Sequence, residues 1–229
     1  MNQLPFRHRF IVFDLDGTLV DSQHTIVHCM GQAFRADGLA APTAPSVHSI
    51  IGLKLEVAVN VLLPEPDEGR AQRVAGLYRE AFHERLSQPD HEEPLFEGAR
   101  DVLAALDHPE LMLGIVTGKG RNGLVRVLEG HGIEDCFATL RTADDGPSKP
   151  HPHVLQLAMA DVGADPQDTV MIGDTTFDIQ MARDAGCDAL GVDWGYHHRD
   201  QLHAAGAGLV IDKFTDLHEA LVSLSGATG

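Results

Sequence analysis

The alternation of short apolar runs with helical patterns most constrains how this chain folds. The first run, Phe10–Phe13, contains aromatic and β-branched residues and ends abruptly at Asp14. Runs of this kind without polar alternation are typical of strands buried on both faces of a parallel sheet. Between the runs, apolar residues recur at helical spacing and glycines follow them, which predicts crossover helices. The chain is therefore predicted to be an α/β protein with a parallel sheet and right-handed crossovers. The further predicted strands are 111–116, 137–140, 169–172, 189–192 and 209–211.

One stretch interrupts this alternation. Between Asp21 and about Leu95 no run resembles a strand, and apolar residues recur at helical spacing instead. The polar segment 88–94 contains two prolines and is predicted to be a hinge. We therefore predict a helical module inserted directly after the first strand. The expected division is a core of residues 1–20 and 96–229 and an insertion of residues 21–95.

Composition and charge exclude several classes of protein. The chain has 229 residues and a formal net charge of −17, which offers no electrostatic footprint for nucleic acid or an anionic membrane. No segment approaches the ~18 consecutive apolar residues of a membrane span. The apolar run near the start is too short for a signal peptide. The three cysteines form no C-x-x-C pair, so we expect reduced thiols and a cytoplasmic location.

The strongest chemical signal is the segment Asp14-Leu15-Asp16-Gly17-Thr18. Its two carboxylates lie two residues apart, on the same side of an extended chain, just past a predicted strand. Like charges this close repel, and a divalent cation would allow both to stay ionised. The alternative is a simple Asp-Gly turn between a strand and a helix. An Asp-x-Asp pattern after a buried strand is much less common than such a turn.

A second acidic segment, Gly173-Asp174-Thr175-Thr176-Phe177-Asp178, also follows an apolar run. Thr175 or Thr176 is predicted to cap the next helix. Asp174 and Asp178 are four residues apart, so they would repel if both were helical. Coordination of a metal through oxygen ligands would explain the pair. The alternative is an acidic pair favoured by the helix dipole.

Two further segments offer ligands for an anion. Thr117 and Gly118 follow a predicted strand, where a hydroxyl and free backbone N–H groups can cradle a phosphate. Lys149 can supply a point charge for a phosphate, although a solvated surface lysine is the alternative. Because each of the four segments follows a predicted strand, all four are expected at one edge of one sheet.

A rival interpretation comes from Gly118, Gly120 and Gly123, which spell G-x-G-x-x-G after a predicted strand, with Asp144 further on. This spacing suggests a dinucleotide site and thus a nicotinamide oxidoreductase. That interpretation leaves both acidic segments without a role. The inventory as a whole suits phosphoryl transfer better: one aspartate can attack phosphorus, and a second can transfer protons.

These segments resemble those of the haloacid dehalogenase superfamily of aspartate-dependent phosphohydrolases, and the resemblance covers essentially the whole chain. It implies a doubly wound, Rossmann-like parallel sheet with an inserted helical cap of the phosphoglycolate phosphatase-like branch. It implies that Asp14 is the nucleophile and Asp16 the general acid/base. The implied ligands of the phosphoryl group are Thr117, Gly118 and Lys149. The implied ligands of Mg²⁺ are the Asp14 side chain, the Asp16 backbone carbonyl and Asp174. Asp178 would support these ligands without touching the metal, or would bind it through a water molecule.

The resemblance also bears on the substrate. It implies a small phosphorylated metabolite, with phosphoglycolate as the best choice and pyrophosphate, sugar phosphates or nucleoside monophosphates as alternatives. Gly52 and Lys54 belong to a loop expected to face the site, and Lys54 is a candidate contact for a substrate carboxylate. A solvated Lys54 at a helix end is the alternative.

Other activities of related proteins are less favoured. The dehalogenases of this superfamily lack the second aspartate, so the presence of Asp16 argues against dehalogenation. A phosphonate hydrolase of this build needs a cap lysine that forms a Schiff base. Lys54 is the only lysine of the insertion, and the residues around it do not match that motif well. A β-phosphoglucomutase-like mutase remains an alternative. A receiver-like or non-catalytic phosphate-binding protein is an alternative of a different class, but receivers are shorter and lack a helical insertion.

The 14 histidines raise the question of a zinc site. Neither His151 with His153 nor His197 with His198 has the spacing of a zinc motif, whereas His24 and His28, four residues apart on a predicted helix, could bind a metal but more often face solvent. We expect these side chains to be solvated. The pairs are His24 with His28, His151 with His153, and His197 with His198.

Overall fold

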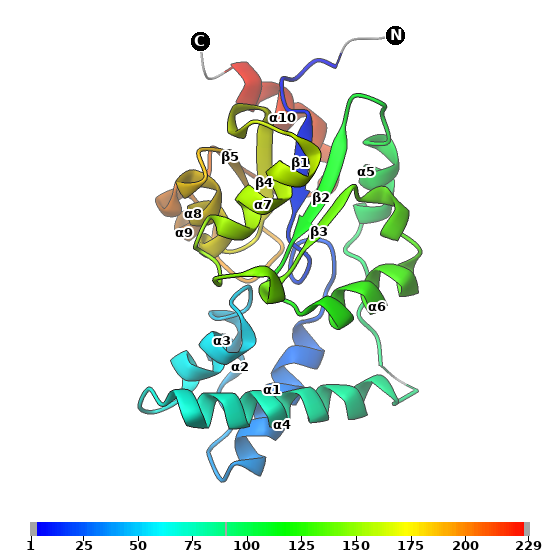
Figure 1. The fold of residues 1–229 in the computed structure, drawn as a ribbon. Helices are drawn as coiled ribbons and strands as arrows, with labels where there is room; N and C mark the ends of the chain where they lie inside the picture. Colours follow the sequence, from blue (N-terminus) through cyan, green and yellow to red (C-terminus); the bar gives the residue numbers. More distant parts are fainter. Residues whose placement is uncertain (1–3, 90, 227–229) are drawn as a thin grey trace.

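Parallel strands form the centre of the computed structural model, which describes residues 4–89 and 91–226 (Figure 1). The ends of the predicted core, 1–3 and 227–229, and position 90 of the predicted hinge lie outside the described residues. Within the described residues the predicted strands are confirmed. The strands are β1 (Phe10–Phe13), β2 (Met112–Val116), β3 (Thr139–Arg141), β4 (Thr169–Gly173), β5 (Asp188–Val192) and β6 (Leu209–Ile211). β3 begins two residues later than predicted, and Phe137 is the C-cap residue of a 3₁₀ turn, Glu134–Cys136.

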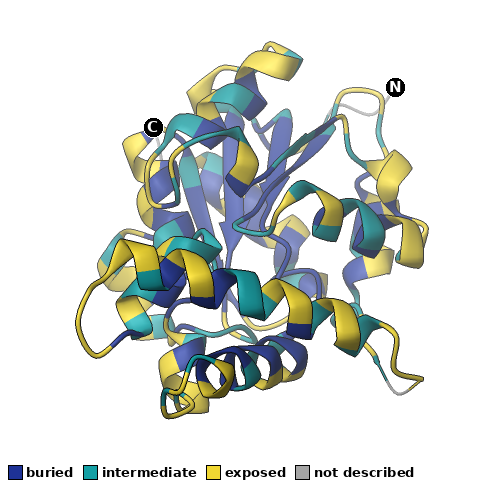
Figure 2. Ribbon diagram, turned by 60° about the horizontal axis from the view of Figure 1, so that its bottom comes forward, coloured by how far each residue is buried: buried dark blue, intermediate teal, exposed yellow. Residues whose placement is uncertain are grey.

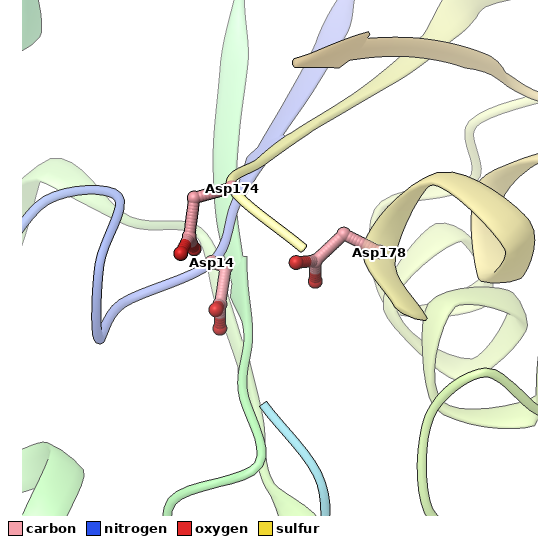
Figure 3. A group of neighbouring side chains, drawn as sticks. All are labelled: Asp14, Asp174 and Asp178. Carbon is pink, nitrogen blue, oxygen red and sulfur yellow. The ribbon is translucent and has the colours of Figure 1, made fainter. Parts of the chain in front are cut away.

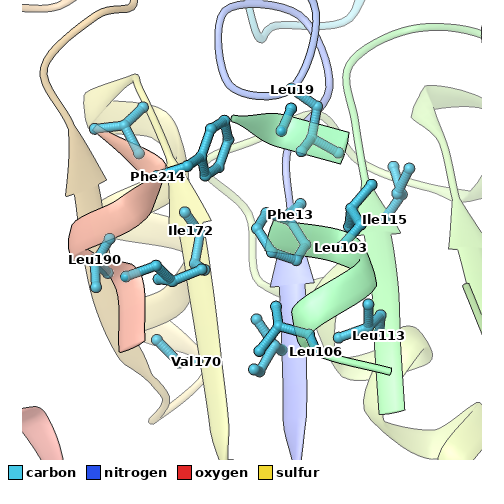
Figure 4. Close-up of a cluster of buried hydrophobic side chains, with 14 of the residues drawn as sticks. Phe13, Leu19, Leu103, Leu106, Leu113, Ile115, Val170, Ile172, Leu190 and Phe214 are labelled. Carbon is cyan, nitrogen blue, oxygen red and sulfur yellow. The ribbon is translucent and has the colours of Figure 1, made fainter. Parts of the chain in front are cut away.

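Helices cover both faces of the sheet, as the doubly wound prediction requires. In β1, Ile11 and Phe13 enter one hydrophobic cluster, and Phe10 and Val12 enter another on the opposite face. Figure 4 shows the first cluster, where Phe13 lies between Ile115 and Ile172 of the neighbouring strands. The first face carries α5 (Ala99–Ala105), α6 (Arg121–His131) and α10 (Leu217–Gly226); the second carries α7 (His153–Val162), α8 (Thr176–Asp184) and α9 (Arg199–Ala205).

The strand order is β3-β2-β1-β4-β5-β6, so β1 pairs with both β2 and β4. The chain builds the sheet outward in one direction from β1 and then in the other. In open parallel sheets, ligands bind beyond the carboxyl ends of the strands at this reversal of direction. Asp14 follows β1 and Asp174 follows β4, so both aspartates lie at this point.

Residues 21–95, which we call the helical segment, contain helices and no strand of the sheet among their described residues. Their helices pack mainly on one another and enclose a separate hydrophobic cluster that includes Met30, Phe34 and Val74. In Figure 2 the strands are buried almost throughout, whereas these helices show alternating buried and exposed residues. The helices are α1 (Gln23–Ala36), α2 (Ala44–His48), α3 (Leu55–Leu62) and α4 (Glu68–Leu86).

The chain leaves and rejoins the core at one place. The Asp21 N–H donates to the Pro94 carbonyl at 2.8 Å, and the Phe96 N–H donates to the Leu19 carbonyl at 2.9 Å. The two connecting segments therefore lie side by side, as an insertion after β1 requires. This pairing brings Glu93, at the end of the predicted hinge, next to the core.

The structure bears on two expectations from the sequence, reduced thiols and the lack of a membrane span. Cys29, Cys136 and Cys187 are free thiols, and Cys29 and Cys187 are buried. Within residues 4–89 and 91–226, no helix combines the length and hydrophobicity that a membrane span requires.

Candidate active site

Three aspartates converge at the carboxyl ends of β1 and β4 (Figure 3). Asp14 and Asp174 come from the ends of these adjacent strands, and Asp178 comes from the first turn of α8. One carboxylate oxygen of each lies within 4.8 Å of the others, and all three residues are buried. The structure therefore brings together the two acidic segments that the sequence places far apart.

Lys149 lies between two of these carboxylates. Its ammonium is 2.8 Å from Oδ1 of Asp14 and donates a hydrogen bond of 2.6 Å to Oδ1 of Asp178. The Lys149 side chain is only 2% exposed. Burial alone would lower its pKa, but the charges of Asp14 and Asp178 raise the pKa above its usual value. Lys149 is therefore a buried cation that belongs to the aspartate cluster, not a solvated surface lysine.

The Asp14 carboxylate has few partners for a buried charge. The contact with Lys149 falls outside hydrogen-bond geometry, and neither Asp14 oxygen has a hydrogen-bond partner among the described residues. Asp174 is better supported: its Oδ1 accepts from the Thr18 hydroxyl at 3.0 Å and its Oδ2 from the Tyr196 N–H at 2.9 Å. Buried polar groups are normally hydrogen-bonded, so two Asp14 oxygens without hydrogen bonds indicate a missing ligand.

Burial raises the pKa of Asp14 to about 7, even though Lys149 opposes the shift. Burial also raises the pKa of Asp174 well above its usual value, and the nearby charges of Asp14 and Asp178 add to the effect. A divalent cation among the oxygens would keep these groups ionised. Carboxylate oxygens are the ligands that Mg²⁺ prefers, so the residues present fit a Mg²⁺ site.

Asp178 has a second structural role at the start of α8. Thr175 is the N-cap, which confirms one of the two predicted caps, and its hydroxyl accepts from the Asp178 N–H. In return, Oδ2 of Asp178 accepts from the Thr175 hydroxyl at 2.6 Å and its N–H at 3.1 Å. Asp174 precedes this cap, so Asp174 and Asp178 do not share a helix face. One oxygen of Asp178 thus caps the helix while the other holds Lys149.

Asp16 is bound by side chains that sequence reasoning missed. Oδ1 accepts from the Ser22 hydroxyl at 2.6 Å, and the Lys119 ammonium donates to Oδ1 at 2.8 Å and to Oδ2 at 3.0 Å. Burial alone would lower the pKa of Lys119, but the carboxylates of Asp16 and Glu93 raise it. A basic residue shortly after Thr117, on the edge predicted to face the site, is the signal that could have found Lys119.

The loops after the strands meet a loop of the helical segment. Thr117 is buried, and its hydroxyl accepts from the Lys119 N–H at 3.1 Å. A Cβ atom on Gly118 would overlap the Gly52 carbonyl oxygen, so only glycine allows this close approach. The Lys54 N–H donates to the Ser148 hydroxyl at 2.8 Å. Gly52 therefore lies beside the predicted phosphate loop, and Lys54 lies beside the segment that carries Lys149.

A cavity of about 850 Å³ lies between the helical segment and the core. The core contributes Asp14, Asp16 and Thr117 to its wall, and the helical segment contributes mainly apolar side chains such as Met30, Tyr78 and Phe82. Basic side chains complete the wall. They are Lys54, Arg79, Lys119, Arg121 and Arg126.

The structure corrects the expectation for His197. It is 8% exposed, its Nδ1 accepts from the Thr176 N–H at 3.0 Å, and its ring lies edge-on to Phe177. Burial lowers the pKa of this histidine. The loop after β5 folds over the start of α8, and the sequence pattern did not show this contact. His24, His28, His151 and His198 are exposed and His153 is half-buried.

The geometry also argues against the dinucleotide interpretation of Gly118, Gly120 and Gly123. The Arg121 N–H at the start of α6 donates to Oδ2 of Asp144 at 2.8 Å. A dinucleotide would place its pyrophosphate at this helix start. The Asp144 carboxylate instead occupies the start of this helix, so it is not placed to bind the ribose of a dinucleotide.

Comparison with known proteins agrees with this fold. Residues 11–192 match the model of the haloacid dehalogenase-like hydrolase family. The chain belongs to this family, and it is therefore an enzyme of the hydrolase class.

Relatives match over nearly the whole chain. A Dickeya dadantii protein named "Probable phosphatase IndB" is 36% identical, over 94% of this chain and 95% of its own length. A Vibrio vulnificus protein named phosphoglycolate phosphatase is 31% identical, over 93% of this chain and 96% of its own length. A solved structure of a hydrolase from Pseudomonas syringae superposes with a TM-score of 0.83 at 25% identity, covering 95% of this chain and 100% of that chain.

Proposed function

We propose that this protein is a Mg²⁺-dependent phosphatase that hydrolyses the phosphomonoester of a small metabolite through an aspartyl-phosphate. One observation carries the proposal: Asp14 is a buried carboxylate whose oxygens lack hydrogen bonds, beside Lys149 and two further carboxylates. A carboxylate without hydrogen bonds to its oxygens is free to act as a nucleophile. The names of the relatives support a phosphatase, and phosphoglycolate is the leading substrate.

The reaction has two steps. In the first, an Asp14 oxygen forms a bond to phosphorus while the bond to the leaving oxygen breaks, and Asp16 gives its proton to that oxygen. In the second, water attacks phosphorus, Asp16 takes a proton from it, and the bond to Asp14 breaks to release phosphate. Lys149, the Thr117 hydroxyl and the Gly118 N–H hold the phosphoryl oxygens through both steps.

The Mg²⁺ would be held by the side chains of Asp14 and Asp174 and by the Asp16 backbone carbonyl. Asp178 lies next to these ligands and positions Lys149 through a hydrogen bond. When bound, Mg²⁺ supplies positive charge that neutralises the phosphoryl oxygens and the carboxylates.

We propose that residues 21–95 act as a cap that covers the phosphate site. The contacts of the Gly52 loop with Gly118 and Ser148 support this role. A closed cap excludes bulk water from the reacting groups, and its residues select the leaving group. Lys54 lines the cavity from this side.

The cavity favours a second candidate substrate class. About 850 Å³ exceeds what a two-carbon leaving group fills, and apolar side chains line the cap side. A sugar phosphate or a nucleoside monophosphate would use more of this space. Pyrophosphate and a mutase reaction on a sugar phosphate are further alternatives.

The test is phosphate release from a panel of phosphomonoesters and pyrophosphate, measured with Mg²⁺ and with EDTA. The panel contains phosphoglycolate, hexose phosphates, nucleoside monophosphates and p-nitrophenyl phosphate. We expect release that requires Mg²⁺, and the ranking of kcat/KM identifies the leaving group. Release from no compound would contradict the proposed function.

A further inference from the structure

Lys119 is a buried cation at the active site that the proposed chemistry does not use. It follows the phosphate loop after β2, and its side chain is 10% exposed. Its ammonium contacts both carboxylate oxygens of Asp16 and lines the cavity between the helical segment and the core. The proposed roles of Thr117, Lys149 and the metal ligands leave Lys119 without a function.

The surroundings place the Lys119 ammonium at the wall of the cavity. Its aliphatic stem lies over Gly123 in α6, where a Cβ atom would be 3.1 Å from Cγ. The ammonium is 5.5 Å from the centre of the Phe82 ring of α4, and 3.9 Å from Oε1 of Glu93. Groups from the core and from two parts of the helical segment, α4 and the predicted hinge, therefore converge on this one charge.

We propose that Lys119 selects the substrate by binding a second anionic group, a carboxylate or a phosphate, close to the ester oxygen. This inference rests on the proposed function, because it needs Asp16 to act at the leaving oxygen. Lys119 contacts Asp16 at 2.8 and 3.0 Å, so the first atoms attached to the leaving oxygen lie within reach of its ammonium. Lys119 thus faces the leaving group, whereas Lys149 faces the phosphoryl group.

Charge explains why the bound group is an anion. The chain carries a net charge of −17, so an anionic leaving group needs a local cation to enter the cavity. Arg126, the next cation along this wall, is held by Glu93 at 2.7 Å. When Lys119 turns to the substrate, the Ser22 hydroxyl still anchors Oδ1 of Asp16 at 2.6 Å. Asp16 therefore stays in position while Lys119 exchanges one anion for another.

The test compares substrates that differ only in the second charge. One pair is phosphoglycolate and its neutral isostere phosphoglycolamide; the other is ethylene glycol bisphosphate and 2-hydroxyethyl phosphate. We expect kcat/KM to favour the charged member of at least one pair by tenfold or more. A preference in the first pair indicates that the bound group is a carboxylate, and a preference in the second pair indicates a phosphate.

In Lys119→Met we expect this preference to fall to nearly one, mainly through KM, and in Lys119→Arg we expect most of it to return. Lys54→Met tests the rival cation on the cap side. Lys213→Met removes an exposed lysine that does not line the cavity and serves as the matched control. An equal loss on both members of each pair in Lys119→Met would mean that Lys119 only orients Asp16. Loss of the preference in Lys54→Met alone would also overturn the inference.

A variant without turnover remains testable by binding. Calorimetry is done on Asp14→Asn and on the double variant with Lys119→Met. It measures how much more tightly each binds phosphoglycolate than phosphoglycolamide, and ethylene glycol bisphosphate than 2-hydroxyethyl phosphate. An unchanged difference in both pairs overturns the role of Lys119. If the wild-type protein releases phosphate from none of the esters, including p-nitrophenyl phosphate, the proposed function itself fails. These two failures are therefore distinguishable.

Discussion

The ammonium of Lys149 lies 2.8 Å from Oδ1 of Asp14, although Asp14 directly follows β1 and Lys149 comes between β3 and α7. The same ammonium also serves Asp178. Among the described residues, this cluster therefore sets one positive charge against three buried carboxylates, those of Asp14, Asp174 and Asp178. The excess of negative charge matches one divalent cation, and the first prediction follows from it.

Mg²⁺ is expected to stabilise the protein more at pH 8 than at pH 5. The pKa of Asp14 is raised to about 7 in the folded protein, so between about pH 4 and 7 the folded state holds more protons than the unfolded state. Without metal, this group therefore makes the folded state less stable as the pH rises through that window. Mg²⁺ binds the ionised carboxylates and offsets the loss. At a hundred times Kd the gain is about 2.7 kcal/mol, or roughly 5–10 °C in Tm.

Differential scanning fluorimetry with Mg²⁺ and with EDTA across this pH range measures the effect. NaCl at the same ionic strength serves as the control for ionic strength. A Tm shift that is equal at both pH values would contradict the raised pKa of Asp14.

Asp14→Asn is expected to abolish turnover while the protein stays folded. The amide keeps the size of the side chain but removes the nucleophile, and losses of a nucleophile reach about 10⁶-fold in kcat. Because the change also removes one buried negative charge, the metal-free variant should unfold at or above the wild-type Tm near pH 8. Phosphate release and circular dichroism measure the two outcomes. Activity retained by this variant would refute the aspartyl-phosphate.

Asp16→Asn is expected to impair the hydrolysis of alkyl phosphates much more than the first step with p-nitrophenyl phosphate. An alkoxide needs the proton that Asp16 supplies, whereas nitrophenolate is a weak base and leaves without it. The missing general base should then slow the second step. Rapid-quench measurement should show a burst of about one nitrophenolate per site, followed by slow turnover. Equal loss of both reactions, without a burst, would assign Asp16 another role.

Gly118→Ala is expected to lower kcat/KM by about 100-fold, because a methyl group there overlaps the Gly52 carbonyl oxygen and displaces the helical segment. Gly130→Ala is the matched control. Gly130 lies inside α6 with no other atom within 4 Å of an added Cβ, so alanine should stabilise that helix by roughly 0.5–1 kcal/mol and leave activity unchanged. Steady-state kinetics and thermal melts of both variants give the comparison. Full activity in Gly118→Ala would show that this close approach is not needed for turnover.

Much of the fold could be predicted because strand burial and helical amphipathicity are written locally in the chain. The run Phe10–Phe13 is uninterrupted by polar residues because both faces of β1 are covered. The positions of Asp14, Thr117 and Asp174 after strands also follow from this local pattern. The edge of the sheet at which they meet is then a consequence of parallel strands.

The partners of these residues could not be predicted in the same way. Hydrophobic periodicity reports which residues are buried, and it carries no information on which loop folds against which. Lys119 stands between Gly118 and Gly120 of the glycine pattern, yet it binds Asp16, and His197 was expected to be solvated although its side chain is buried. Such contacts depend on how far each loop reaches across the edge of the sheet.

The sequence by itself determined the class of fold, the insertion after the first strand and the acidic segments at the strand ends, because each is a local property of spacing and polarity. Only the tertiary structure decided which charged groups pair. Lys149 pairs with Asp14 and Asp178, Lys119 pairs with Asp16, and Asp144 accepts a hydrogen bond at the start of α6. The physical reason is that Coulombic and hydrogen-bond pairing depends on separations of a few ångströms between groups far apart in the chain, and only the packed sheet, helices and loops set those separations.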